Sequence, residues 1–212
     1  MYKRQEVVVL ACNSATIQVV EWCRAKWPEV AFVGMEPGVK PAVKKTRSKI
    51  IGVLATEASL TGEMFRKLVE KYGAGCEVLT QACPKFVELV EQGILVGPEV
   101  DEAIWEYAGP LVRGGADVLV LGCTHYPFLK REIARLFPEV ELVDTGAAVA
   151  RQVGEVLGGR TERSARLEGE EQLVRIYTSG APEVLNELLP DLVPEVRGSI
   201  FPLNLRNCEA AK

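Results

Sequence analysis

The stretch "DVLVLGCTHYP" at residues 117–127 joins a short apolar run to a glycine, a cysteine and the only histidine of the chain. Apolar runs of this length, rich in valine and leucine and ended by a small residue, are typical of strands buried in a parallel sheet. Pro127 suits the first turn of a helix. The stretch therefore predicts a strand, then a turn that carries Cys123, Thr124 and His125, then a helix.

A second copy of this pattern lies near the start of the chain. "VVVLACNSAT…KWPEVAFVGMEP" at residues 7–37 aligns with "VLVLGCTHYP…LFPEVELVDTG" at residues 118–146. Both copies read as strand, cysteine, hydroxyl residues, helix, Pro-Glu-Val and strand. Such a repeat predicts two similar half-domains. Each offers one cysteine, Cys12 or Cys123, at the carboxyl end of a strand, which is the edge where open α/β sheets bind ligands.

The rest of the chain alternates apolar runs with amphipathic segments. Strands are expected at residues 6–12, 50–56, 76–82, 117–123 and 140–146, and helices at 59–73, 84–93, 99–115 and 128–137. This alternation predicts an α/β fold of two pseudosymmetric three-layer half-domains with parallel sheets. The first half-domain is expected to comprise residues 1–36 plus 147–212, and the second residues 37–146. Within the tail, a strand is expected at 173–180, a helix at 182–190 and an apolar run at 198–205.

The two copies differ in what precedes them. From Ile50, which opens the second copy, 73 residues lead to Cys123, whereas only 11 residues precede Cys12. If the halves are equivalent, about 60 residues are missing, which is two strands of a doubly wound sheet. We therefore expect the first half-domain to lack its N-terminal strands and to expose an unpaired sheet edge.

Composition excludes several classes of function. The chain has 212 residues, 48% of them apolar and 25% charged, and a net charge of −4, so nothing favours nucleic acid or an anionic membrane as a partner. No segment approaches the roughly 20 apolar residues of a membrane span, and the N-terminus does not read as a signal peptide. The basic run at 40–49 is interpreted as a solvated connector. Six scattered cysteines without a CxxC pair indicate free thiols, a cytoplasmic protein and no structural zinc.

Two thiols that face each other across a small anionic ligand suit one kind of reaction. One thiol, as thiolate, takes a proton from carbon, and the other donates a proton to the opposite face, which inverts a stereocentre without a cofactor. Amides at the start of a helix favour both a thiolate and a bound carboxylate. Further donors near the thiols are expected from the side chains of Asn13, Ser14, Thr16, Thr124 and Tyr126.

Each of these residues also has a purely structural interpretation. Thr56 and Ser59 either offer hydroxyls to a ligand or only cap a helix. His125 either tunes Cys123 or is a packed histidine, and Glu91 either supports His125 or is a solvated helix residue. A thiol-dependent hydrolase using Cys123 and His125 is a further alternative, but it explains only one copy of the repeat.

The motifs "ACNSAT", "IGVLATEAS", "ACPKFVELVEQG", "GCTHYP" and "LVDTGAAVA", in this order and spacing, resemble those of bacterial glutamate racemases. The resemblance implies a cofactor-independent enzyme, commonly a homodimer, that makes D-glutamate for peptidoglycan. A metal site of Cys12, Cys123 and His125 is not expected, because further ligands at the usual spacing are lacking. It implies Cys12 and Cys123 as the two acid/base residues, with His125 beside the second. It implies substrate contacts from Asn13, Ser14, Thr56, Thr124 and His125, and Glu91 as a support for His125.

The resemblance is incomplete at the front of the chain. The family opens with a strand that ends in an Asp-Ser turn, followed by a Pro-Tyr-Gly segment, and neither is present in this sequence. Their absence favours one alternative, an inactive fragment that only binds a ligand or a partner. A second alternative, within the same class of enzyme, is racemisation of aspartate or another amino acid.

Overall fold

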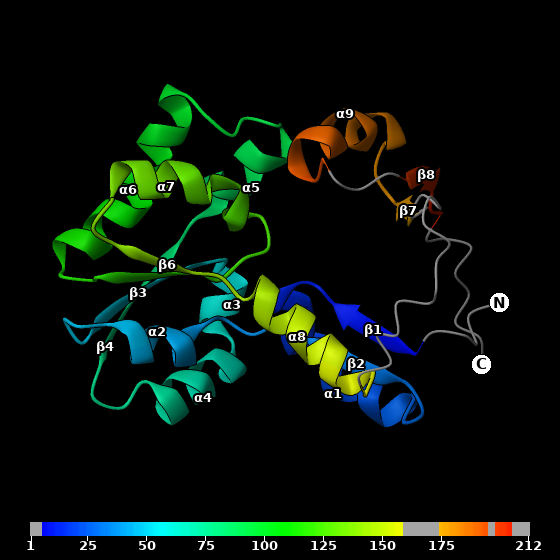
Figure 1. The fold of residues 1–212 in the computed structure, drawn as a ribbon, viewed down its shortest axis with the longest axis horizontal. Helices are drawn as coiled ribbons and strands as arrows, with labels where there is room; N and C mark the ends of the chain where they lie inside the picture. Colours follow the sequence, from blue (N-terminus) through cyan, green and yellow to red (C-terminus); the bar gives the residue numbers. More distant parts are fainter. Residues whose placement is uncertain (1–5, 159–173, 195–197, 205–212) are drawn as a thin grey trace. The chain divides into compact units, whose positions relative to one another are not determined.

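The computed structural model describes residues 6–158, 174–194 and 198–204 (Figure 1). The chain forms two compact units, Met1–Thr161 and Glu162–Lys212. The strands of the first unit are β1 Val7–Leu10, β2 Ala31–Gly34, β3 Ile50–Ala55, β4 Glu77–Ala82, β5 Val118–Leu121 and β6 Glu141–Val143. Its helices are α1 Asn13–Lys26, α2 Val39–Lys45, α3 Glu57–Thr61, α4 Glu63–Tyr72, α5 Pro84–Glu91, α6 Pro98–Arg113, the 3₁₀ helix η1 Tyr126–Leu129, α7 Lys130–Leu136 and α8 Gly146–Val156. In the second unit, β7 Val174–Thr178 pairs in parallel with β8 Gly198–Pro202, and α9 Pro182–Leu192 connects them.

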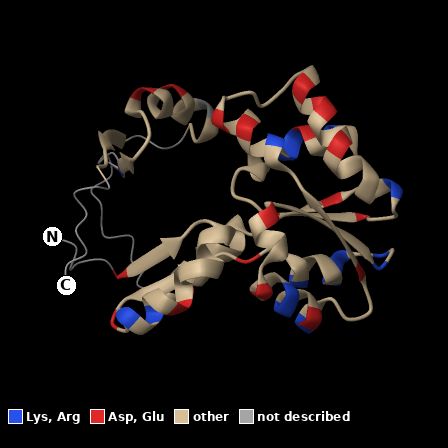
Figure 2. Ribbon diagram, turned by 180° about the vertical axis from the view of Figure 1, so that it is seen from behind, with Lys and Arg blue, Asp and Glu red and all other residues tan. Residues whose placement is uncertain are grey.

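A four-stranded parallel sheet in the order β4-β3-β5-β6 forms the centre of the second half-domain. All four residues of β5 are buried, as are five of the six in β3. Figure 1 shows α5, α6 and α7 on one face of this sheet and α2 and α4 on the other. Charged residues lie mainly on helices and loops, while the strands of the sheet are mostly uncharged (Figure 2). The predicted α/β fold with parallel sheets is thus confirmed.

One glycine leaves room for leucine side chains of α6 and of the neighbouring strand. A Cβ atom added to Gly52 in β3 would lie 2.5 Å from Leu119 Cδ2 and 2.9 Å from Leu111 Cδ1. Real Cβ atoms do not approach other atoms so closely, so a side chain at position 52 would force Leu111 of α6 and Leu119 of β5 to move.

In the first half-domain, β1 pairs in parallel with β2, with Val7 opposite Ala31 and Leu10 opposite Gly34. Helices α1 and α8 pack against these strands. The packing of α8 agrees with the expectation that the chain returns to the first half-domain after residue 146. The assignment of residues 162–212 to that half-domain stays a prediction. No helix in the described ranges is long and apolar enough to cross a membrane.

Three expectations about local structure are wrong. The basic run at 40–49 is not a solvated connector, because α2 occupies most of it and buries Val39 and Ala42 completely in the core, while its lysines face outward. The segment 59–73 is two helices rather than one, because the backbone turns into an extended conformation at Gly62. The segment 128–137 lies partly in a 3₁₀ helix that begins at Tyr126, before α7.

Asp117, just before β5, holds the loop that follows α2. Its carboxylate accepts hydrogen bonds from the backbone N–H groups of Arg47 and Ser48, at 2.8 and 2.9 Å, and from the hydroxyls of Thr46 and Ser48. Burial opposes the charge, but these hydrogen bonds outweigh it and lower the pKa of Asp117 to about 2. The charged form is therefore the one that fits the fold.

We expect Asp117→Asn to lower the free energy of unfolding at pH 7 by about 1–2 kcal/mol, because it removes the negative charge and replaces one of the two acceptor oxygens by an NH2 donor. A carboxyl with a depressed pKa stabilises the fold above its ordinary value near 3.8, and this contribution is lost as pH falls toward 2. Urea unfolding of both proteins between pH 7 and pH 2 tests this. The exposed residue Glu139 supplies the control, Glu139→Gln. Equal pH dependence in wild type and Asp117→Asn would contradict the assignment.

Candidate functional site

The two cysteines of the sequence repeat occupy equivalent places in the fold. Cys12 is the N-cap of α1 after β1, and its Sγ atom accepts a hydrogen bond from the Ala15 N–H at 3.5 Å. Cys123 follows β5 and precedes the 3₁₀ helix η1. The Cys12 side chain is exposed and that of Cys123 is partly buried, and both are free thiols. Each thiol thus lies at the carboxyl end of a parallel strand.

Asn13 connects the segments that carry these thiols. Its Nδ2 atom donates a hydrogen bond of 2.7 Å to the carbonyl oxygen of Gly122, 109 residues away. Asn13 directly follows Cys12, and Gly122 directly precedes Cys123. Its Oδ1 atom is buried and has no hydrogen-bond partner among the described residues. An unpaired buried acceptor is unfavourable unless a ligand supplies a donor.

Three hydroxyls form a second bridge between the half-domains. The Ser14 Oγ atom lies 3.0 Å from both Thr56 Oγ1 and Ser59 Oγ, and these two also hydrogen-bond to each other at 3.0 Å. Thr56 is also the N-cap of α3, where its Oγ1 atom accepts from the Ser59 N–H. Ser59 is completely buried, whereas Ser14 and Thr56 are partly exposed. For Thr56, the capping role and a position in the site therefore coexist.

His125 lies between Cys123 and Glu91. Its Nδ1 atom is 3.7 Å from Cys123 Sγ, and its Nε2 atom is 2.6 Å from Glu91 Oε1. The hydrogen bond with Cys123 raises the pKa of His125 to about 9, burial opposes this change, and Glu91 adds to it. His125 is consequently an imidazolium at neutral pH, and both of its ring nitrogens donate hydrogen bonds.

Two of the expected ligand donors have other partners. Thr16 Oγ1 donates to the Leu10 carbonyl and accepts from the Met35 N–H, so it ties α1 to β1 and to the end of β2. Tyr126 is completely buried, and its hydroxyl donates to the Cys83 carbonyl at 2.9 Å. The expectation that these two side chains face a ligand is wrong. Thr124 is partly buried, and its hydroxyl makes no hydrogen bond within the described part of the chain.

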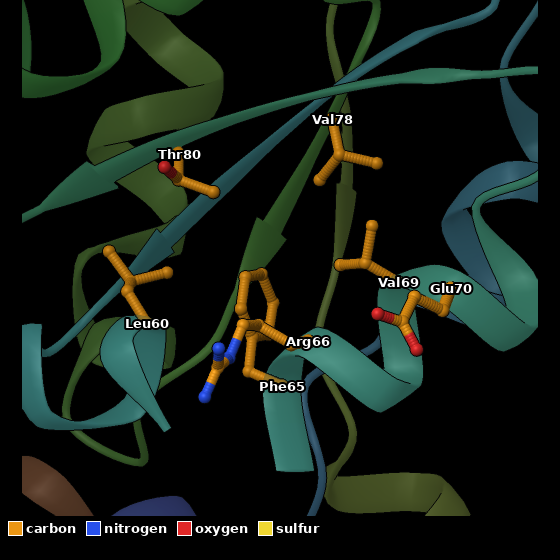
Figure 3. Close-up of a pocket in the computed structure, with 7 residues that line it drawn as sticks. All are labelled: Leu60, Phe65, Arg66, Val69, Glu70, Val78 and Thr80. Carbon is orange, nitrogen blue, oxygen red and sulfur yellow. The ribbon is translucent and has the colours of Figure 1, made fainter. Parts of the chain in front are cut away.

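No metal cluster marks this site among the residues that the structure describes. Over residues 6–158, 174–194 and 198–204, no group of three or more His, Cys, Asp or Glu side chains is placed to hold a metal ion. A pocket of about 310 Å³ lies elsewhere, between α3, α4 and β4 (Figure 3). Its lining residues are Leu60, Phe65, Arg66, Val69, Glu70, Val78 and Thr80. None of the predicted site residues lines it, so it is not the site of the two thiols.

Comparisons with known proteins agree on one family. The sequence model of the family described as Asp/Glu/Hydantoin racemase matches residues 2–153. A glutamate racemase of Pseudomonas putida (strain GB-1) is 44% identical over 188 residues, which cover 88% of this chain and 70% of that protein. The structure of Escherichia coli glutamate racemase in complex with L-glutamate and the activator UDP-MurNAc-Ala is 27% identical. It superposes with a TM-score of 0.77 over 93% of this chain and 74% of that one. A glutamate racemase isoform from Bacillus anthracis shares the fold, with a TM-score of 0.78 over 94% of this chain and 74% of that one, at 23% identity.

Proposed function

This chain belongs to the Asp/Glu/hydantoin racemase family, and we propose from that premise that it interconverts L- and D-glutamate by two-thiol proton transfer. As a family member it is an isomerase. The choice of glutamate is supported by relatives named glutamate racemase at 42–45% identity over 88% of this chain. The single observation that carries the two-thiol proposal is the hydrogen bond from Asn13 to Gly122, which joins the segments that hold Cys12 and Cys123.

In the proposed reaction the thiols exchange roles with the direction of the reaction. The thiolate of one cysteine removes the α-proton of glutamate, which leaves an electron pair on the α-carbon that the adjacent carboxyl group delocalises. The thiol of the other cysteine then donates its proton to the opposite face of that carbon. One enantiomer is deprotonated by Cys12 and the other by Cys123. No electrons enter or leave, so no redox cofactor is required.

The surrounding polar groups suit the substrate. The unpaired Oδ1 atom of Asn13 is an acceptor for the α-ammonium group of glutamate. The hydroxyls of Ser14 and Thr124 are donors for its carboxylates, and Thr56, whose hydroxyl donates to Ser59, lies close to the substrate beside Ser14. The His125 imidazolium donates through Nδ1 to Cys123 and is held by Glu91 through Nε2. A contact at each ring nitrogen thus fixes the orientation of the His125 ring beside one of the two thiols.

The same proposal covers the wider role of the protein. The D-glutamate product is a precursor of peptidoglycan, and we propose that the enzyme works in the cytoplasm as a homodimer. We also propose that residues 1–36 and 147–212 form one half-domain and residues 37–146 the other, which is supported by the packing of α8 against β1 and β2.

Exchange of the α-proton of L- and D-glutamate in D₂O, followed by proton NMR, tests the proposed function because it detects each half-reaction separately. We expect exchange and inversion with both enantiomers of glutamate, and much slower exchange with L- and D-aspartate. Faster exchange with aspartate than with glutamate would show that aspartate, and not glutamate, is the substrate. A sample that is folded by circular dichroism but exchanges neither amino acid would refute the activity and favour a chain that only binds.

A further inference from the structure

We infer that Tyr126 is a positioning residue, whose hydrogen bond to the Cys83 carbonyl orients α5 so that Glu91 lies on His125. Only the effect of this positioning on proton transfer by Cys123 rests on the proposed function. The geometry is a separate claim about how α5 and the Cys123–His125 turn are held together.

The contact at the start of α5 is buried and is packed against aromatic rings. The Tyr126 hydroxyl donates to the Cys83 carbonyl at 2.9 Å, and both residues are completely buried. The Tyr126 ring packs edge-on against Phe86, with centroids 5.2 Å apart, and Phe86 packs in the same way against Tyr107 at 5.3 Å. Burial raises the pKa of Tyr126, so its hydroxyl keeps the proton that it donates.

Cys83 is the residue from which α5 starts. Its N–H donates to the Ala55 carbonyl at the end of β3, at 3.1 Å, and its carbonyl accepts from Tyr126. The next residue, Pro84, is the first of α5 and has no N–H group to contribute. The backbone before the helix is thus held on one side by the sheet and on the other by Tyr126.

The contact at the other end of α5 is exposed. Glu91 is the last residue of the helix, and its side chain is 64% exposed. An exposed ion pair contributes only about 0–1 kcal/mol, so it does not hold a helix in place by itself. The 2.6 Å contact between Glu91 and His125 therefore depends on where the helix is held. Tyr126 and His125 are neighbours in the chain. One contacts the start of α5 through Cys83, and the other contacts its end through Glu91.

Few charged groups act on His125. Cys123 faces it from its own segment, and Glu91 faces it from α5. The other charged side chains of α5, Lys85 and Glu88, contact each other, and Lys85 also pairs with Glu99. Cys83 and Tyr126 stay neutral because burial raises the pKa of each. A displacement of α5 therefore changes the pKa of His125 chiefly through Glu91.

The titration of His125 tests the inference, because this is the only histidine in the chain and its imidazole signals need no assignment. In Tyr126→Phe we expect its pKa, measured by NMR, to fall from about 9 by about one unit, since the contact with Glu91 loosens. Glu91→Gln is expected to lower the pKa by at least as much. As a control, Leu68→Ala destabilises the core at α4 and leaves the titration unchanged.

A folded Tyr126→Phe protein whose His125 titrates as in wild type would overturn the inference and leave Tyr126 a purely structural residue. If Tyr126→Phe does not fold, Phe86→Leu, which removes the ring that seats Tyr126, must lower the same pKa, and no change there would equally overturn it. Glutamate exchange by wild type is measured in parallel. A lower His125 pKa in Tyr126→Phe, together with no exchange of glutamate by wild type, would refute the proposed function and leave the positioning role intact.

Discussion

We expect Cys12→Ala and Cys123→Ala each to lower the rate of glutamate racemisation by at least about 10³-fold, because each removes a group that must transfer a proton to or from carbon. The two variants differ in their half-reactions. Each is expected to exchange the α-proton of at most one enantiomer in D₂O, and the two variants retain opposite enantiomers. Proton NMR and polarimetry on the same samples give both quantities.

Cys76→Ala is the matched control, since Cys76 is also a free thiol and lies in the loop before β4, outside the site. We expect it to racemise glutamate at nearly the wild-type rate. Racemisation close to the wild-type rate in either Cys12→Ala or Cys123→Ala would show that the reaction does not use two thiols.

The second large effect is expected at Asn13, a residue that is 3% exposed. Asn13→Ala leaves the Gly122 carbonyl without its side-chain donor and removes the acceptor proposed for the substrate ammonium. We expect the free energy of unfolding to fall by about 1–3 kcal/mol and kcat/KM for glutamate to fall by about 10²-fold or more. Urea unfolding and steady-state kinetics measure the two losses.

Two further variants serve as comparisons for the losses of stability and of kcat/KM in Asn13→Ala. Gln18→Ala changes an exposed polar residue of the same helix and is expected to alter stability by less than about 0.5 kcal/mol. Asn13→Asp keeps an acceptor but replaces the donor, so its carboxylate faces the Gly122 carbonyl and stability falls. Wild-type kcat/KM in a folded Asn13→Ala protein would exclude Asn13 from substrate binding.

The fold of the second half-domain was predictable because its signals are local. The apolar runs that become β3 and β5 are short, rich in β-branched residues or leucine, and ended by small or polar residues. The basic run at 40–49 misled the prediction because its charged residues outnumber the apolar ones. Val39 and Ala42 are sufficient to bury one side of α2, and a seven-residue helix is too short to show a clear period.

Within the candidate site, residue types were predictable and their partners were not. The repeat identified Cys12 and Cys123, and the sequence offered Thr16 and Tyr126 equally as donors for a ligand. The structure uses the hydroxyls of both to bind backbone carbonyls. The same residue type serves whether its hydroxyl binds a ligand or a backbone carbonyl, so the sequence does not reveal which partner the hydroxyl has.

The sequence by itself determined the alternation of parallel strands with helices, the membership of the family, and the position of each cysteine after a strand, but not α2 or the division between α3 and α4. These properties depend on the spacing of neighbouring residues and on a repeat, both of which are visible in one dimension. Only the tertiary structure decided that Asn13 bonds to Gly122, that Tyr126 bonds to Cys83, and that Glu91 lies on His125. These pairs are 34 to 109 residues apart. Tyr126 and Cys83 meet because β4 and β5 bring their carboxyl ends to one edge of the same sheet. Asn13 and Gly122 follow strands of two different sheets, and Glu91 lies at the end of α5, so these two pairs depend on how whole elements pack together.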